Sequence, residues 1–157
     1  MNKVIAFFKE NNMEDKIRVF EESSATVELA AAAIGCEPRR IAKTLSFKGE
    51  DTSILIVAAG DAKIDNGRFK AQFGIKAKML SAQEVTEYIG HSVGGVCPFV
   101  LKENVQVYLD ESLRRFQTVY TACGSSNSVI ELTLRELEQY TEGSIWVDVC
   151  KNWQESL

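Results

Sequence analysis

Hydrophobic residues in the first part of the chain alternate between helical spacing and strand spacing. Apolar residues recur every three to four positions within residues 2–11, which predicts a helix, and the apolar run at 17–20 predicts a short strand. A second helix is expected next, with Ser24 as its capping residue and Gly35 as its end. Its apolar stripe consists of Val27, Ala30, Ala31 and Ile34.

Two adjacent strands are predicted over 42–47 and 53–58. The second contains a continuous apolar run, typical of a strand buried on both faces, so we expect it near the centre of the sheet. A short helix should follow over 65–73. Ser81 opens a further helix, because its Ser-x-x-Glu spacing is that of a capping box, and this helix should end before Gly90.

The second half of the chain is richer in strand patterns. Thr133 has the same capping-box spacing and predicts one helix there. Short connections between the later strands favour antiparallel neighbours. Strands are predicted at 96–99, 105–109, 118–122, 129–132 and 145–149. The pattern predicts an α+β fold with a mixed, largely antiparallel central sheet flanked by helices.

Length and composition favour one folded domain over residues 1–157. The 157 residues are 45% hydrophobic and 25% charged, with two prolines, which is a globular composition. The N-terminus lacks the apolar core of a signal peptide, and no later segment has the roughly 18 consecutive apolar residues of a membrane span. We therefore expect a cytoplasmic protein with no membrane partner.

Charge is distributed unevenly along the chain. The net charge of −4 argues against a general nucleic-acid binder. However, residues 35–80 contain nine Lys or Arg against five acidic residues, and residues 81–157 contain five against eleven. The basic segment is either a surface that meets phosphates or an ordinary solvated face.

Several reaction classes find no support in the sequence. The four cysteines, Cys36, Cys97, Cys123 and Cys150, form no C-x-x-C pair and have no histidine cluster beside them, which predicts reduced thiols and no metal. Phosphate-loop, dinucleotide-binding and zinc-peptidase motifs are absent, so no cofactor is expected. A thiol hydrolase would need Cys97 to lie within hydrogen-bond reach of the only histidine, His91.

Three local features remain as candidate chemistry. Lys43 lies in an otherwise apolar strand, either as a snorkelling side chain or as a charge held in a cleft. Gly94 and Gly95 form either a tight turn or a backbone that can approach a ligand and direct amide groups at it. Residues 120–127 run from a strand into a small polar loop, which either lines the same pocket or is a plain hairpin.

These three features, taken in order, carry a family resemblance. RIAKTLSFK, SVGGVCPF and VYTACGSSNSVIEL, the last followed by a helix, resemble the motifs of the YbaK/ProX family of aminoacyl-tRNA deacylases. Members of that family are free-standing relatives of the editing insertion in bacterial prolyl-tRNA synthetase. The match runs from about residue 15 to about residue 148, with nearly gapless spacing.

The resemblance implies a single α+β domain that removes wrong amino acids from tRNA, chiefly tRNA for proline. Small amino acids such as cysteine or alanine are the expected cargo. Lys43 corresponds to the family's key active-site lysine, and Gly94 and Gly95 correspond to its glycine pair, whose backbone lines the pocket for the aminoacyl ester. The implied partners are the acceptor end of aminoacyl-tRNA and a prolyl-tRNA synthetase.

The chain departs from the family pattern at several positions. Cys97 replaces the usual serine before proline, and Val100 replaces a frequent glycine. Relative to the cysteine-specific branch, Phe20 replaces a tyrosine, Val129 replaces an aspartate, and the small-residue loop reads Ala122-Cys123-Gly124. These differences leave the substrate open. The alternative is a non-catalytic module of the same fold that binds tRNA or a synthetase.

A mechanism follows as a hypothesis. An ordinary lysine, with a pKa of about 10.4, is protonated, so Lys43 would act as an electrostatic anchor for the terminal phosphate or the ester oxygen. Amides around Gly94 to Val96 would stabilise the oxyanion. The nucleophile would be water, or the substrate's own thiol if that substrate is cysteine. The expected pocket residues are Phe20, Thr44, Val96, Cys97, Pro98, Phe99, Ala122, Cys123 and Gly124.

Overall fold

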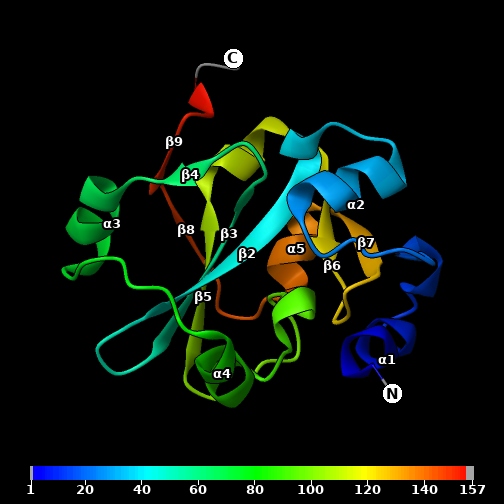
Figure 1. The fold of residues 1–157 in the computed structure, drawn as a ribbon, viewed down its shortest axis with the longest axis horizontal. Helices are drawn as coiled ribbons and strands as arrows, with labels where there is room; N and C mark the ends of the chain where they lie inside the picture. The colour runs from blue at the N-terminus through cyan, green and yellow to red at the C-terminus, as the bar shows by residue number, and fades with distance from the viewer. Residues whose placement is uncertain (1, 155–157) are drawn as a thin grey trace.

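The two strands predicted over 42–47 and 53–58 lie side by side in the interior of a seven-stranded sheet. In the computed structural model, which describes residues 2–154, β2 (Ile41–Lys48) pairs antiparallel with β3 (Ser53–Ala59) from Ala42↔Ala59 to Lys48↔Ser53. Strand β3 is buried along nearly its whole length, as its sequence predicted. Figure 1 shows β2 running diagonally through the molecule, with helix α2 beside its first residues.

The sheet order is β1-β7-β6-β2-β3-β5-β8, which confirms the mixed α+β fold. The pairs β1–β7, β7–β6 and β2–β3 are antiparallel, whereas β6–β2, β3–β5 and β5–β8 are parallel. The remaining strands are β1 (Ile17–Val19), β5 (Val105–Asp110), β6 (Thr118–Ala122), β7 (Ser128–Thr133) and β8 (Ile145–Val147).

Short connections predicted the antiparallel pairing of β6 with β7 but not the pairing of β5 with β8. Those two strands are parallel because the chain between them passes through β6, β7 and a helix, a crossover long enough for parallel neighbours. Strand β8 ends at Val147, earlier than expected, and the Val149 N–H donates to the Asp110 carboxylate instead, at 3.0 Å. A separate two-stranded sheet, β4 (Lys63–Ile64) with β9 (Cys150–Lys151), was not predicted.

Helices cover both faces of the sheet. Helices α1 and α5 and the π-helical turn Val85–Ile89 after α4 pack on one face, and α2 and α3 pack on the other. Among the described helices, none has the length and apolar character needed to cross a membrane. Their bounds are α1 (Lys3–Glu10), α2 (Val27–Ile34), α3 (Asn66–Phe73), α4 (Ala82–Glu84) and α5 (Leu134–Tyr140).

The capping predictions have mixed outcomes. Capping boxes at Ser81 and Thr133 are both present. Helix α2, however, is capped by Thr26, whose hydroxyl accepts from the Leu29 N–H at 3.1 Å. Ser24 cannot cap this helix because it is buried against a distant loop, where its N–H donates to the Ser126 carbonyl at 2.6 Å.

The strand predicted at 96–99 is wrong, because this segment is an irregular loop that follows a 3₁₀ turn at Val93–Gly95. Its carbonyl at Phe99 accepts from a side chain, His91 Nε2, rather than from a neighbouring strand. The loop turns sharply at Val100, whose φ of 52° lies in the left-handed region. A β-branched residue is strained there, whereas the glycine expected from the family pattern would not be.

Replacing Val100 with glycine should therefore stabilise the protein. The left-handed backbone costs an L-residue about 1–2 kcal/mol, and the extra freedom of glycine in the unfolded chain offsets about 0.4–1 kcal/mol of that gain. Val100 is 37% exposed, so the lost burial of its side chain offsets a further part of the gain. We expect Val100→Gly to raise Tm by about 1–2 °C in thermal unfolding. Val19→Gly, in an exposed strand position without positive φ, should lower Tm; an unchanged or lower Tm for Val100→Gly would contradict the strain.

Candidate functional site

A cavity opens where strands β2 and β6 separate. Their parallel ladder consists of Ile41↔Tyr120 and Ala42↔Thr121 and goes no further. Beyond it lies a cavity of about 210 Å³, between β2, the beginning of α2 and the turn at 93–95. Its walls include Lys43, Thr44, Gly94, Val96, Tyr120 and Ala122. The fold thus brings together members of all three sequence motifs.

Lys43 reaches from β2 along the wall of this cavity. Its Nζ donates to the carbonyl of Gly60, at 3.3 Å, and to that of Ala62. Burial lowers the pKa of the Lys43 ammonium, because desolvation penalises its charge. An ammonium has three N–H donors, so one remains for a ligand. The side chain is therefore a partly buried, hydrogen-bonded charge rather than a snorkelling surface residue.

The two glycines of the turn have different places. Gly94 lines the cavity, whereas Gly95 is buried behind it and its N–H donates to the Ser92 carbonyl at 2.9 Å. A Cβ on Gly95 would lie 2.6 Å from the Gly124 carbonyl carbon, so the two loops pack backbone against backbone. The expectation that Gly95 offers an amide to the substrate is therefore wrong; its lack of a side chain permits loop packing instead.

Other amides of the turn remain available. For the N–H groups of Gly94 and Val96, no acceptor between residues 2 and 154 meets the geometry of a hydrogen bond. Both residues line the cavity. An unpaired amide beside a cavity can bind a carbonyl oxygen or an oxyanion.

Cys97 and His91, the pair that a thiol hydrolase would need, lie close together but do not form a catalytic pair. The Cys97 sulfur lies 3.7 Å from His91 Nε2, and both side chains are buried. That nitrogen also lies 2.8 Å from the Phe99 carbonyl, which can only accept, so Nε2 carries the proton and cannot accept one from the thiol. Burial raises the pKa of Cys97 to about 12 and lowers that of His91. Cys97 is a neutral core thiol.

Several predicted pocket residues lie outside the cavity. Cys97, Phe99 and Cys123 are fully buried in the core, because the apolar interior takes their side chains. Pro98 lines a separate depression beside Phe7 and Tyr140. The Phe20 ring packs under the Arg18 guanidinium, with the Arg18 Cζ atom 5.5 Å from the centroid of the ring. Gly124, with φ of 87°, packs on the start of α1 rather than on the cavity.

Some cavity residues carried no signal that singled them out in the sequence. They come from α2 and from the start of β2, at positions that looked like ordinary core. Helix propensity and strand alternation cannot show that these elements face one another. These residues are Val27, Ala30 and Ile41.

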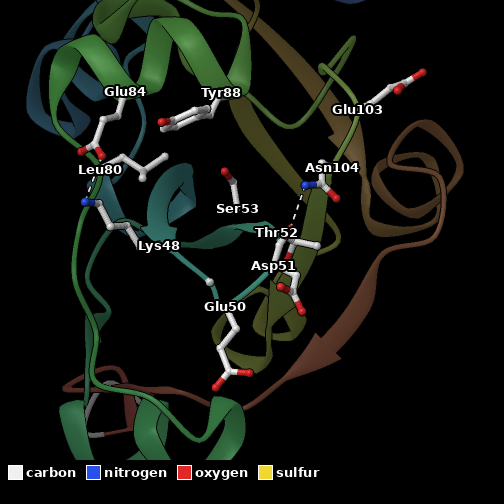
Figure 2. A pocket seen from close by; sticks show the side chains of 11 residues that line it. Lys48, Glu50, Asp51, Thr52, Ser53, Leu80, Glu84, Tyr88, Glu103 and Asn104 are labelled. Carbon is white, nitrogen blue, oxygen red and sulfur yellow. Dashed lines mark hydrogen bonds and ion pairs between the residues drawn. The ribbon is translucent and has the colours of Figure 1, made fainter.

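A second depression, of about 360 Å³, lies at the β2–β3 hairpin (Figure 2). Its lysine, Lys48, is already paired with Glu84 at 3.0 Å, and the Ser81 amide and Lys48 together hold the pKa of Glu84 at about 2. Figure 2 shows the carboxylates of Glu50 and Glu103 pointing away from the space. In the described part of the chain, no cluster of acidic, histidine or cysteine side chains could hold a metal ion.

Thiol labelling should distinguish the core cysteines from the accessible one. Cys36 is partly exposed, whereas Cys97, Cys123 and Cys150 are buried. Desolvation raises the pKa of all four thiols, so accessibility is what distinguishes Cys36. At pH 8 we expect native protein to react with one equivalent of a disulfide reagent and denatured protein to react with four. Cys36→Ser should remove the native reaction. Rapid labelling of Cys97 in the native protein, located by mass spectrometry, would support the alternative in which the Cys97 thiol is the nucleophile.

Comparisons with known proteins identify the family of the chain. The model of the aminoacyl-tRNA editing domain family matches residues 21–140. The chain is 56% identical to the uncharacterised protein YwhH of Bacillus subtilis (strain 168), covering 98% of this chain and 99% of that one. It is 27% identical to EbsC of Enterococcus faecalis (strain ATCC 700802 / V583), named as a candidate Cys-tRNA(Pro)/Cys-tRNA(Cys) deacylase, over 79% of this chain and 77% of that one.

A solved structure gives the same result for the fold. The crystal structure of a candidate trans-editing enzyme for prolyl tRNA synthetase superposes with a TM-score of 0.84 at 28% sequence identity, covering 96% of each chain. The matched family region spans all three motifs and every strand that lines the cavity. The chain belongs to the aminoacyl-tRNA editing domain family, the YbaK/ProX family that its motifs resemble.

Proposed function

We propose that this protein hydrolyses mischarged aminoacyl-tRNA, releasing a small wrong amino acid from tRNA for proline. The observation that carries the proposal is one cavity lined by Lys43 and by Gly94 and Val96, the two residues of the turn whose amides are unpaired. Family membership supports the reaction class, and the names of EbsC and of the similar crystal structure support tRNA for proline.

The reaction needs positioning more than a strong nucleophile. An aminoacyl ester is activated, so a water molecule held near its carbonyl carbon can add to it. The oxyanion that forms would be stabilised by the Gly94 and Val96 amides. The carbon–oxygen bond to the ribose then breaks, the ribose oxygen takes a proton, and the free amino acid leaves. No thiol of the chain takes part.

Lys43 acts in this scheme as a positively charged anchor. The Gly60 and Ala62 carbonyls fix its ammonium and compensate for part of the desolvation. Its third N–H is directed to the ester or to the terminal phosphate. Lysine is suited to this because its charge attracts an oxyanion without proton transfer.

The size of the cavity supports a small amino acid as the group that is removed from the tRNA. A synthetase separates side chains that differ by one methylene by only about 1–3 kcal/mol, so a second pocket has to remove the errors. The cavity of about 210 Å³ is closed by apolar side chains from α2, β6 and β7, which would favour small residues such as alanine or cysteine. A prolyl-tRNA synthetase that releases the mischarged tRNA is the second partner in this proposal.

The basic segment 35–80 divides into two parts. Arg39, Arg40, Lys48 and Arg68 are engaged in ion pairs with carboxylates. Lys63, Lys70, Lys76 and Lys78 have no ion-pair partner within residues 2–154 and are exposed around α3. These lysines are the cations available to the phosphates of the acceptor stem.

Removing Lys43 should abolish most of the activity. Purified protein is given tRNA for proline carrying alanine, cysteine, serine, threonine or 2-aminobutyrate, and release of the amino acid is followed. We expect Lys43→Ala to slow the release of the preferred amino acid by about a hundredfold or more, the usual effect of losing one such electrostatic contact. Lys48→Ala is the matched control on the same strand, outside the cavity, and should retain activity.

Two outcomes would count against this proposal. Full activity of Lys43→Ala would exclude the lysine as the anchor. Binding of the tRNA by wild-type protein without release of any amino acid would favour a non-catalytic tRNA-binding module.

Salt dependence should identify the phosphate contacts. Each lysine that neutralises a phosphate makes binding more sensitive to salt. We expect Lys76→Ala to lower kcat/KM several-fold at low salt and to reduce by about 1 the slope of log(kcat/KM) against log[salt]. Lys16→Ala, at an exposed lysine before β1, is the control and should leave the slope unchanged; equal slopes for wild type and Lys76→Ala would remove Lys76 from the interface.

A further inference from the structure

The open edge of β2 presents backbone groups to the cavity. In an antiparallel strand, successive residues direct their N–H and C=O groups alternately to the two sides. The Lys48 N–H donates to the Lys78 carbonyl at 2.9 Å, and the Ser46 carbonyl accepts from the Leu80 N–H at 3.1 Å. Ser46 and Lys48 therefore face away from β3. Because Thr44 has the same parity, its N–H and C=O face that side too.

Thr44 lies between two stretches that are paired. On one side of it, Ala42 belongs to the β2–β6 ladder, which ends with Ala42↔Thr121. On the other side, Ser46 is the first residue bonded to the 78–80 segment. Within the described residues, neither the N–H nor the C=O of Thr44 has a backbone partner. This edge position lines the cavity.

Ala122 adds a second unpaired carbonyl. The Cys123 N–H points to β7, where it donates to the Ser128 carbonyl at 3.1 Å, so Ala122 points the opposite way, toward β2. One more step of the parallel ladder would join the Ala122 carbonyl to the Thr44 N–H, and the ladder stops before that step. Ala122 also lines the cavity.

We propose that Thr44 and Ala122 form a backbone subsite for the α-amino end of the aminoacyl group. This inference rests on the proposed function and specifies how the cargo is held. An aminoacyl ester carries a donor ammonium and an acceptor carbonyl on either side of one Cα, as a strand residue does. Its ammonium donates to the Thr44 and Ala122 carbonyls. Its ester carbonyl accepts from the Thr44 N–H, and the Gly94 and Val96 amides add to this donor when that carbonyl becomes the oxyanion. The aminoacyl group thus takes the place of one missing residue in the sheet.

The subsite makes a free α-ammonium a requirement for hydrolysis. Acylation of that nitrogen removes the charge and leaves a single N–H donor, so buried carbonyls lose their partners when the substrate binds. The enzyme would then distinguish an aminoacyl-tRNA from a tRNA that carries an N-blocked or peptidyl residue. The recognition uses only main-chain groups and so does not depend on the amino acid's side chain.

The first experiment compares each aminoacyl-tRNA of the deacylation panel with its N-acetyl derivative. We expect acetylation to slow release from the preferred substrate by about tenfold to a hundredfold, the effect of losing charge-assisted hydrogen bonds. Equal rates for the free and acetylated forms would overturn the subsite and leave the proposed function intact. Failure to hydrolyse any unblocked substrate would overturn the proposed function, and the second experiment then decides the subsite.

The second experiment measures backbone amide hydrogen exchange by NMR, which needs no turnover. In the free protein the Thr44 amide should exchange faster than those of Lys43 and Leu45, which face β3. Adding the non-hydrolysable amide 3′-alanylamino-3′-deoxyadenosine should slow exchange at Thr44 by about tenfold or more, and the N-acetyl form of this probe should not. Protection of Thr44 equal to its neighbours in the free protein, or no change with the probe, would overturn the subsite.

Discussion

The candidate site depends on the early end of one parallel ladder. Strands β2 and β6 pair only through Ile41↔Tyr120 and Ala42↔Thr121, and then β6 leads into the loop at Gly124. That loop is held elsewhere: its backbone packs against Gly95, and a Cβ on Gly124 would lie 2.4 Å from the Asn2 side-chain oxygen at the start of α1. Because the loop is fixed to these neighbours, β6 cannot continue along β2, and a cavity forms between them.

Strand β2 serves this cavity in more than one way. Its alternate side chains belong to the cores on the two faces of the sheet, as Ala42 and Phe47 show. Lys43 interrupts the apolar pattern with a charge, and the carbonyls of Gly60 and Ala62 meet the requirement that a buried ammonium be hydrogen-bonded. The edge of the same strand supplies unpaired main-chain groups at Thr44. One strand thus contributes packing, charge and hydrogen-bonding groups within a few residues.

The geometry also shows whether the loop at 91–100 contributes through its side chains or through its backbone. A histidine and a cysteine that lie within 4 Å of each other resemble a nucleophile and its base, yet both are buried and the histidine proton is committed to the Phe99 carbonyl. The loop acts through its backbone instead: Gly95 permits close packing on Gly124, and Gly94 lines the cavity. The strained φ at Val100 shows that this loop conformation is retained even where its residue disfavours it.

The sequence by itself determined the elements and the family. Apolar spacing located α1, α2, β2 and β3, capping boxes located α4 and α5, and three ordered motifs pointed to the editing-domain family. These features are local, because each depends on residues a few positions apart. The motifs also predict Lys43, Thr44, Gly94, Val96 and Ala122 as site residues, and all five line the cavity.

Only the tertiary structure decided which of the named residues face the cavity. Cys97, Phe99 and Cys123 belong to motifs that contribute to the site, but their side chains turn into the core. The loop at 96–99 reads as a strand because its apolar pattern fits one, and its bond to His91 was not visible in that pattern. The end of the β2–β6 ladder likewise depends on contacts among Gly95, Gly124 and α1, which are distant in sequence. Burial and strand register are properties of the whole packed chain, and local spacing does not contain them.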